Sequence, residues 1–171
     1  AELAVGYLSA LWREPNFDCW EEHPTDLHPY TLGAIYAGLQ AAERLHDTYG
    51  LPRVELEIDL LNRMRVFTLV HGVREGHFVK RFRPPDRPEE PVHSSPGTEV
   101  DASLIGLATP YRLLPSDDEI LTKTIEKIEA DLYCPGGGIH RYLADTYYGG
   151  GEWILLTAWL GWHYAETGRL E

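Results

Sequence analysis

Helical periodicity, interrupted by long loops rich in polar and aromatic residues, is the feature that most constrains the fold of this chain. Apolar residues recur every three or four positions along much of it, and this spacing predicts amphipathic helices. The predicted helices cover residues 1–13, 31–49, 53–71, 104–114, 119–132 and 152–167. The last of them is apolar on nearly all sides, which is typical of a helix inside a core. We therefore expect an all-α fold.

One segment departs from the helical pattern. Residues 73–83 alternate around Gly76, which predicts a short β-hairpin within the otherwise helical fold. Residues 84–97, which follow it, are rich in proline and charge and predict a mobile surface excursion. In simple helical bundles the loops are short, whereas here they hold much of the polar and aromatic content. This distribution favours a helical scaffold that forms a pocket from its loops.

Composition excludes several classes of protein and of partner. Of the 171 residues, 43% are hydrophobic and 11% aromatic, which excludes disorder over most of the chain. The formal net charge of −12 argues against nucleic acid and against an anionic membrane as partners, because both are polyanions. No run approaches the roughly 18 consecutive apolar residues that a membrane-spanning helix needs.

The cysteines and the two ends of the chain bear on its context. Cys19 and Cys134 fit either a reducing compartment such as the cytoplasm or one long-range disulfide, and both alternatives stay open. The chain begins at Ala1 within a helical pattern, shows no signal peptide, and ends at Glu171 just past another helix. We therefore expect residues 1–171 to be a single region of a longer protein.

The first candidate for chemistry is the tripeptide Trp20-Glu21-Glu22, in a loop that also holds His23 and His28. Glycoside hydrolysis needs a carboxylic acid whose pKa is raised by burial or by a like charge. Two adjacent glutamates beside an indole supply both influences if the loop is partly buried. The alternative is a solvated acidic segment in which Trp20 is a packing residue.

The second candidate is the segment from Arg141 to Trp153, which reads Arg-Tyr-Leu-Ala-Asp-Thr-Tyr-Tyr-Gly-Gly-Gly-Glu-Trp. Sugar sites combine aromatic platforms with charged and polar groups that bind hydroxyls, and glycines allow the backbone to approach a ligand closely. The alternative is a structural loop in which Arg141 and Asp145 pair with each other.

Together these motifs resemble glycoside hydrolase family 15, which comprises glucoamylases, glucodextranases and related bacterial and archaeal enzymes. The resemblance rests on Trp-Glu-Glu, on Val-Asp-Ala-Ser-Leu at residues 100–104, on Arg-Tyr-x-x-Asp-Thr-Tyr-Tyr-x-Gly-x-x-Trp, and on the order of the three. It covers essentially the whole chain.

The resemblance implies an (α/α)6 barrel and an inverting enzyme that releases β-D-glucose from the non-reducing ends of α-glucans or α-gluco-oligosaccharides. It implies that Glu21 is the general acid. It also implies six substrate-binding residues: Trp20, Glu22, Arg141, Tyr142, Asp145 and Trp153. An inverting site needs a second carboxylate as base, with room for a water molecule between the two. The mechanism requires no cofactor, and the resemblance implies no metal.

One departure from the family pattern limits what this chain can do. The family's general base typically lies in a Glu-Gln sequence after the helix that follows residues 152–167, and no Glu-Gln occurs here. The family's early helices are also missing. We therefore expect the central portion of a catalytic domain, inactive alone, whose partners are an α-glucan substrate and the rest of that domain.

Other functions remain open from the sequence. A trehalase or glucodextranase would share the same scaffold, and a catalytically silent glucan-binding or regulatory protein could share the same fold. An all-α barrel with unrelated chemistry, such as an epimerase, also uses carboxylates and aromatic residues. The helix pair His163 and Glu166 has a spacing that can bind metal, but no third ligand accompanies it.

Overall fold

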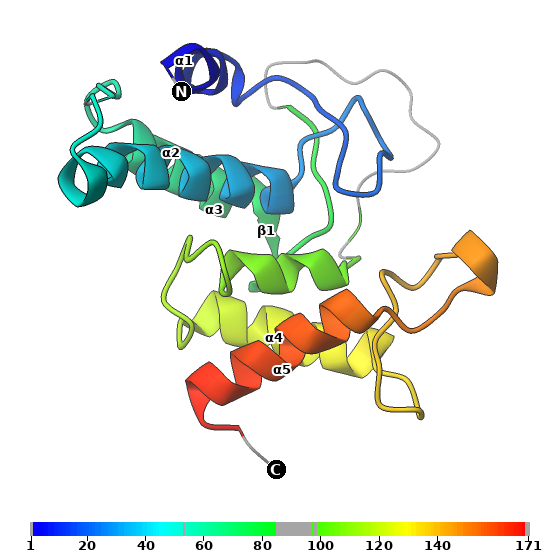
Figure 1. Ribbon diagram of the computed structural model, residues 1–171. Coiled ribbons are helices and arrows are strands. Elements are labelled where there is room, and N and C mark those ends of the chain that lie inside the picture. Colours follow the sequence, from blue (N-terminus) through cyan, green and yellow to red (C-terminus); the bar gives the residue numbers. More distant parts are fainter. Residues whose placement is uncertain (1, 53, 85–96, 98, 170–171) are drawn as a thin grey trace.

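Helices dominate the computed structural model, which describes residues 2–52, 54–84, 97 and 99–169 (Figure 1). The elements, with two short 3-10 helices written η, are α1 (Glu2–Leu11), α2 (Pro29–Tyr49), α3 (Leu60–Gly72), β1 (Val73–Arg74), β2 (His77–Phe78), η1 (Ala102–Leu107), α4 (Glu119–Leu132), η2 (Tyr147–Gly149) and α5 (Ile154–Thr167). The expected all-α class with one small β excursion is confirmed. The (α/α)6 barrel stays a prediction.

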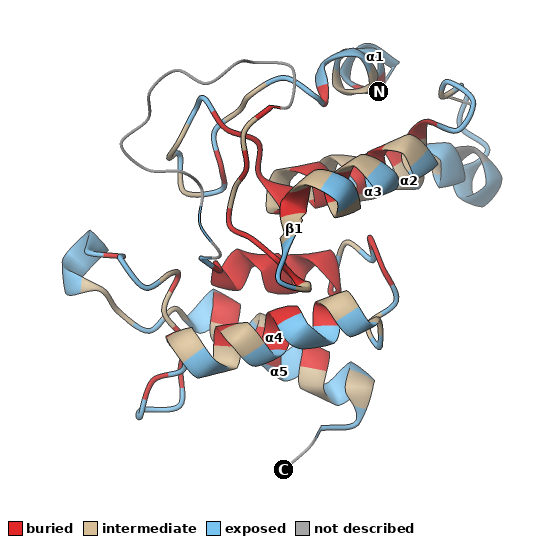
Figure 2. Cartoon of the chain, turned by 180° about the vertical axis from the view of Figure 1, so that it is seen from behind, coloured by how far each residue is buried: buried red, intermediate tan, exposed pale blue. Residues whose placement is uncertain are grey.

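The short helix η1 lies at the centre of the molecule. All of its residues are buried, and it packs against α2 on one side and against α4 and α5 on the other (Figures 1 and 2). Its apolar residues Leu104, Ile105 and Leu107 are fully enclosed. Asp101 caps its first turn by accepting a 2.8 Å hydrogen bond from the backbone N–H of Ser103. The core is therefore built around a segment that begins at a buried carboxylate.

The predicted hairpin is present but short. β1 and β2 pair antiparallel, with Val73 opposite Phe78, and Glu75 and Gly76 both have positive φ in the turn. Beyond β2 the chain turns to a different partner, because Phe82 and Leu27 exchange backbone hydrogen bonds of 2.8 and 2.9 Å. The segment after the hairpin therefore lies beside the loop that precedes α2.

Two predicted helices are wrong in extent. The helix expected over 53–71 begins at Leu60, because residues 54–57 form a segment outside any helix or strand that alternates between half-buried and exposed. Val54 and Leu56 pack there against the core. The helix expected over 104–114 is instead the 3-10 helix η1, which ends before Pro110. Proline has no N–H to donate, and it disfavours helical backbone at the residue before it.

The packing of α1 and α5 also differs from expectation. The spacing of Leu3, Tyr7 and Leu11 predicts one apolar face for α1, but all three are exposed and Val5 is the buried residue of this helix. In α5, Leu156 and Leu160 are buried whereas Ile154 and Leu155 are exposed, so this helix is not enclosed on all sides (Figure 2). Its inner face packs on η1, and no described element covers the opposite face.

The remaining expectations concern the cysteines, the proline-rich segment and membranes. Cys19 and Cys134 are both free thiols, so the disulfide alternative does not hold in this structure. The predicted mobile excursion at 84–97 lies, apart from residues 84 and 97, outside the described residues. Among the helices that the structure describes, none has the length and apolarity to cross a bilayer.

Candidate functional site

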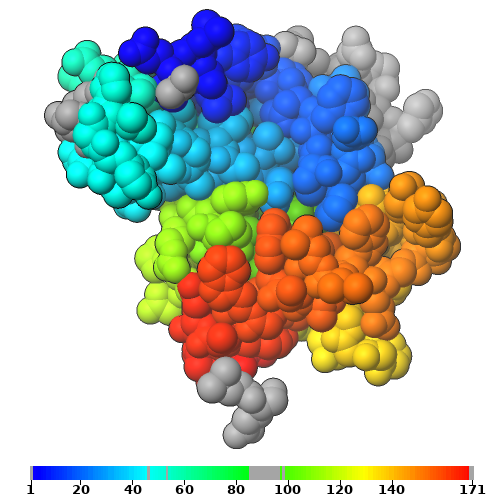
Figure 3. All heavy atoms as spheres, viewed as in Figure 1, coloured from blue at the N-terminus to red at the C-terminus, as the bar shows by residue number. Residues whose placement is uncertain are grey.

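Two segments far apart in the sequence meet at one pocket. The loop before α2 and the loop between α4 and α5 lie against each other at the edge of the molecule, blue and orange in Figure 3. Between them is a cavity of about 570 Å³, lined by Cys19, Trp20, Glu21, Glu22, Arg141, Tyr142, Asp145, Thr146, Tyr147 and Trp153. The structure thus brings together all seven site residues that the sequence predicts.

A tight turn presents the first motif. One carboxylate oxygen of Asp18 accepts hydrogen bonds from the backbone N–H groups of Trp20, at 2.9 Å, and Glu22, at 2.8 Å. Between them Glu21 has a φ of 61°, which is uncommon for a residue with a side chain and is concentrated at functional sites. The Glu21 side chain is exposed at the pocket. Within the described part of the chain no group hydrogen-bonds its carboxylate.

Glu22 is bound on both of its carboxylate oxygens. The hydroxyl of Tyr142 donates a 2.7 Å hydrogen bond to Oε1, and the ammonium of Lys80 donates one of 3.3 Å to Oε2. Partial burial opposes ionisation, but these donors together with the charges of Lys80 and Arg141 outweigh it and lower the pKa of Glu22. Glu22 is therefore an ionised acceptor, and the raised carboxyl pKa expected from the sequence does not occur at this residue.

The second motif contains a buried ion pair. The guanidinium of Arg141 donates two hydrogen bonds to the carboxylate of Asp145, one of them 2.7 Å from Nε to Oδ2. The backbone N–H of Tyr147 adds a third at 2.9 Å. The Arg141 hydrogen bond is the largest influence on Asp145 and lowers its pKa. The pairing considered from the sequence as a structural alternative is present, and it lies within the pocket.

Aromatic rings surround the charged guanidinium. The centre of the Arg141 guanidinium lies 4.9–5.3 Å from the ring centroids of Trp20, Tyr142, Tyr147 and Trp153. Trp20 and Trp153 lie 5.3 Å apart and form an indole wall. Rings and hydrogen-bond donors in one cavity can bind the apolar face and the hydroxyls of a sugar.

The glycines within the second motif permit this arrangement. Gly150 has a φ of 70°, and a Cβ there would lie 2.7 Å from the backbone oxygen of Asp145. Only glycine allows such an approach without strain. The glycine run therefore folds the loop back on Asp145 and carries the chain to Trp153 at the start of α5.

The sequence did not predict two charged residues that are buried beneath the pocket. They are Lys80, which belongs to the site, and Asp101, which contacts Trp20 of the indole wall. Trp20 donates a 2.9 Å hydrogen bond from its ring N–H to Asp101, and the Lys80 ammonium lies 3.5 Å from the same carboxylate. Alternation could not have indicated Lys80, because His77 and Val79, at the opposite parity, are as buried as Phe78 and Phe82.

The remaining polar candidates lie elsewhere. His23 is 3.9 Å from the Glu22 carboxylate, whereas His28 is buried outside the pocket. Glu166 accepts hydrogen bonds from Thr109 and Arg112 rather than from His163. No cluster of three or more residues able to hold a metal ion occurs in the part of the chain that the structure describes.

The chain is similar to known glycosidases. No family model matches the chain. The chain is 37% identical over 167 residues to isomaltose glucohydrolase of Kribbella flavida, covering 98% of this chain and 40% of that protein. It is also 34% identical to an uncharacterized glycosyl hydrolase of Methanocaldococcus jannaschii, over 95% of this chain and 25% of that protein. These homologues are glycosidases.

A more distant relative and the solved structures extend the comparison. Trehalase 1 of Sulfolobus acidocaldarius is 26% identical over 96% of this chain and 26% of its own length. A solved wild-type glycosidase superposes with a TM-score of 0.81 at 38% identity, over 98% of this chain and 42% of that one. A variant glycosidase in complex with glucose has the same TM-score. The chain thus spans about two fifths of the length of the Kribbella flavida protein and of the solved wild-type glycosidase.

Proposed function

We propose that the protein containing this chain is a glycoside hydrolase of the glucoamylase-like family 15, which releases β-D-glucose from the non-reducing end of an α-glucoside by an inverting mechanism. The observation that supports this proposal is the hydrogen bonding of the three carboxylates at the pocket. Glu22 and Asp145 are held by hydrogen-bond donors, whereas Glu21 reaches the same cavity without such a partner in the described chain. Glu21 is therefore the group free to give a proton to a ligand.

In the proposed reaction Glu21 protonates the glycosidic oxygen as the bond from that oxygen to the anomeric carbon breaks. Water attacks the opposite face of the sugar and yields the β anomer. A carboxylate base roughly 6.5–9.5 Å from the acid would activate that water. Because Glu22 and Asp145 are engaged, we place this base outside residues 1–171. The chain alone would then be inactive and would require the rest of the catalytic domain.

The other pocket residues bind the terminal glucose in this proposal. Trp20 and Trp153 provide the aromatic wall, and Tyr142 holds the carboxylate of Glu22. Glu22 accepts hydrogen bonds from sugar hydroxyls, since its carboxylate is ionised. The paired Arg141 and Asp145 offer further donors and acceptors at a site where the two charges balance.

Two relatives bear on the linkage. The homologue with 37% identity is named for isomaltose, which favours an α-1,6-linked disaccharide as substrate. The relative with 26% identity is a trehalase, and it keeps trehalose as a second candidate. The higher identity of the first relative leads us to propose isomaltose or a short α-1,6-linked oligosaccharide.

Proton NMR of the complete polypeptide mixed with isomaltose, maltotriose or trehalose tests the proposal. We expect early β-glucose from isomaltose, before mutarotation equilibrates the two anomers. Initial α-glucose from isomaltose in excess of its share in the equilibrium mixture would overturn the inverting mechanism, because the reducing-end glucose is released as a mixture of both anomers in any case. Turnover of trehalose alone would replace the proposed linkage. No glucose from any of the three, with a folded protein that still binds glucose, would favour the catalytically silent glucan-binding alternative.

A further inference from the structure

A buried lysine outside both sequence motifs lies beneath the pocket. Lys80 follows β2, and only 5% of its surface is exposed. Its ammonium lies 3.3 Å from Oε2 of Glu22 and 3.5 Å from Oδ2 of Asp101. It also lies 3.0 Å from the centroid of the Tyr142 ring. This one charge therefore contacts three groups that form or support the pocket.

The burial of this ammonium requires compensation, because an isolated charge in a protein interior is costly. Two carboxylates and an aromatic face supply it. The compensation is mutual: Asp101 is itself buried, and this burial raises its pKa while Lys80 opposes the shift. The side chain lies within the core and does not line the cavity. Lys80 can thus act on a ligand only through its neighbours.

Those neighbours determine what Lys80 can do. Tyr142 holds one oxygen of Glu22, so Lys80 is the group that fixes the other. With both oxygens held, the carboxylate has one orientation and keeps its negative charge. Asp101 accepts a hydrogen bond from the ring N–H of Trp20. The Lys80 ammonium therefore also contacts the carboxylate that holds one indole of the wall.

We propose that Lys80 is a positioning residue that holds Glu22 ionised and oriented as an acceptor for sugar hydroxyls. This inference rests on the proposed function, since it assigns a task within that site. It also explains why the two adjacent glutamates have different roles. Glu22 is paired with a cation and cannot serve as proton donor, whereas Glu21 has no such pairing in the described chain. A neutral residue at position 80 would remove that distinction.

The charged and titratable groups that face Glu22 must be considered together. They are Lys80, Tyr142, Arg141, His23 and Asp18. The guanidinium of Arg141 is already paired with Asp145, and His23 lies 3.9 Å away and is partly exposed. Lys80 is therefore the cation whose removal should change the ionisation of Glu22 most.

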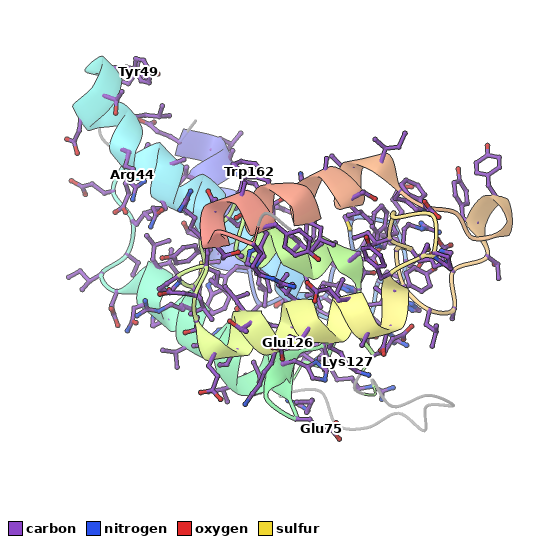
Figure 4. All side chains as sticks on the ribbon, turned by 90° about the horizontal axis from the view of Figure 1, so that it is seen from below. Arg44, Tyr49, Glu75, Glu126, Lys127 and Trp162 are labelled. Atoms are coloured by element: carbon purple, nitrogen blue, oxygen red, sulfur yellow. The ribbon has the colours of Figure 1, made fainter. Side chains whose placement is uncertain are left out.

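The test uses the complete polypeptide with 13C-labelled glutamate side chains, with the Glu22 signal assigned by its loss in Glu22→Gln. Lys80→Met keeps the length of the side chain and removes the charge. We expect the pKa of Glu22 to rise by about one unit or more, as when an opposite charge is lost at close range. Lys80→Arg should restore most of the shift. Lys127→Met, which breaks a partly exposed ion pair with Asp131 on α4, is the matched control (Figure 4).

Binding and turnover provide the second readout. In Lys80→Met, glucose affinity followed by tryptophan fluorescence should fall about tenfold, and the pH below which binding is lost should move upward. KM should rise more than kcat falls, because the proton donor is untouched. An unchanged Glu22 titration in a folded Lys80→Met protein would overturn the proposal, as would equal losses in Lys80→Met and Lys80→Arg.

The role of Lys80 can be tested even if Lys80→Met fails to fold or the wild-type protein is inactive. If Lys80→Met fails to fold, Lys80→Met combined with Asp101→Asn removes both buried charges while keeping an acceptor for Trp20, and the same Glu22 titration applies. If the wild-type protein hydrolyses no glucoside, the proposed function fails. The NMR titration still decides whether Lys80 controls Glu22, because that measurement needs no turnover.

Discussion

The hydroxyl of Tyr142 donates a 2.7 Å hydrogen bond to Oε1 of Glu22, which lies 120 residues earlier in the chain. This contact joins the two motifs that carry the sugar-site prediction. Glu21, which precedes Glu22, and Arg141, which precedes Tyr142, line the same pocket. The geometry of the pocket therefore depends on two loops. They are held together by the hydrogen bond from Tyr142 to Glu22 and by Lys80, which lies beneath the pocket.

Replacing Glu21 should abolish turnover while leaving ligand binding largely intact. In the complete protein we expect Glu21→Gln to lower kcat by about 10²–10⁴-fold, since the amide cannot donate the proton that acid catalysis requires. Glucose affinity should change little, because the Glu21 side chain has no hydrogen-bond partner in the described chain whose loss would disturb the pocket. Steady-state kinetics and a fluorescence titration with glucose check both halves.

The control for this variant is Glu126→Gln, which makes the same substitution at an exposed position of α4 (Figure 4). It should match the wild type in rate and affinity. Retention of more than about a tenth of the wild-type rate in Glu21→Gln would refute the assignment of the acid, given the usual size of this effect.

Removing the Tyr142 hydroxyl should weaken the hold on Glu22. Hydrogen bonds to charged groups contribute about 1.5–3 kcal/mol, so Tyr142→Phe should raise KM by roughly tenfold or more. The pKa of Glu22 should also rise, because the bond that favours its ionised form is lost. The acid side of the KM profile should therefore shift to higher pH. A Tyr142→Phe enzyme with an unaltered profile would contradict this account of Glu22.

Much of the fold could be predicted from periodicity, and the exceptions have local causes. The helices α2, α4 and α5 agree with the predicted ranges within a few residues. The start of α3 was wrong because Leu56 fits a helical spacing and an alternating one equally well. Its partial burial outside any helix depends on tertiary packing, which no short window contains.

The site was predictable to the extent that its residues lie in motifs. All seven expected residues line one pocket, but their pairing could not be derived from spacing. The pKa of Glu22 depends on Lys80, which lies 58 residues away, so its lowering required the three-dimensional structure. The exposure of Glu21 likewise depends on a turn held by the side chain of Asp18.

The buried pair of Arg141 and Asp145 should make stability depend on pH. The pKa of Asp145 is lowered in the folded state, so its contribution is present above the unfolded value near ~4 and is lost as the pH falls below that value. Asp145→Asn should destabilise the protein by about 3–5 kcal/mol at neutral pH, because it leaves the guanidinium without its counter-ion.

Thermal unfolding between pH 3 and pH 7 measures this effect in the complete protein. The difference in Tm between the wild type and Asp145→Asn should be largest near neutrality and shrink toward pH 3. Asp47→Asn, at an exposed position of α2, should run parallel to the wild type. A constant Tm difference across the range would show that Asp145 stabilises the loop by packing rather than by its charge.

The exposed apolar side of α5 should make the isolated chain prone to self-association. Ile154 is 87% and Leu155 56% exposed, and Trp162 lies on the same helix with 46% exposed (Figure 4). Soluble monomers seldom expose large contiguous apolar surface, so residues 1–171 produced alone should bind a hydrophobic dye and self-associate in sedimentation. Leu155→Lys should reduce both effects, whereas Thr122→Lys, which adds the same charge at an exposed position of α4, should not. A dye-free, cooperatively unfolding monomer would mean that this face needs no cover from the rest of a catalytic domain.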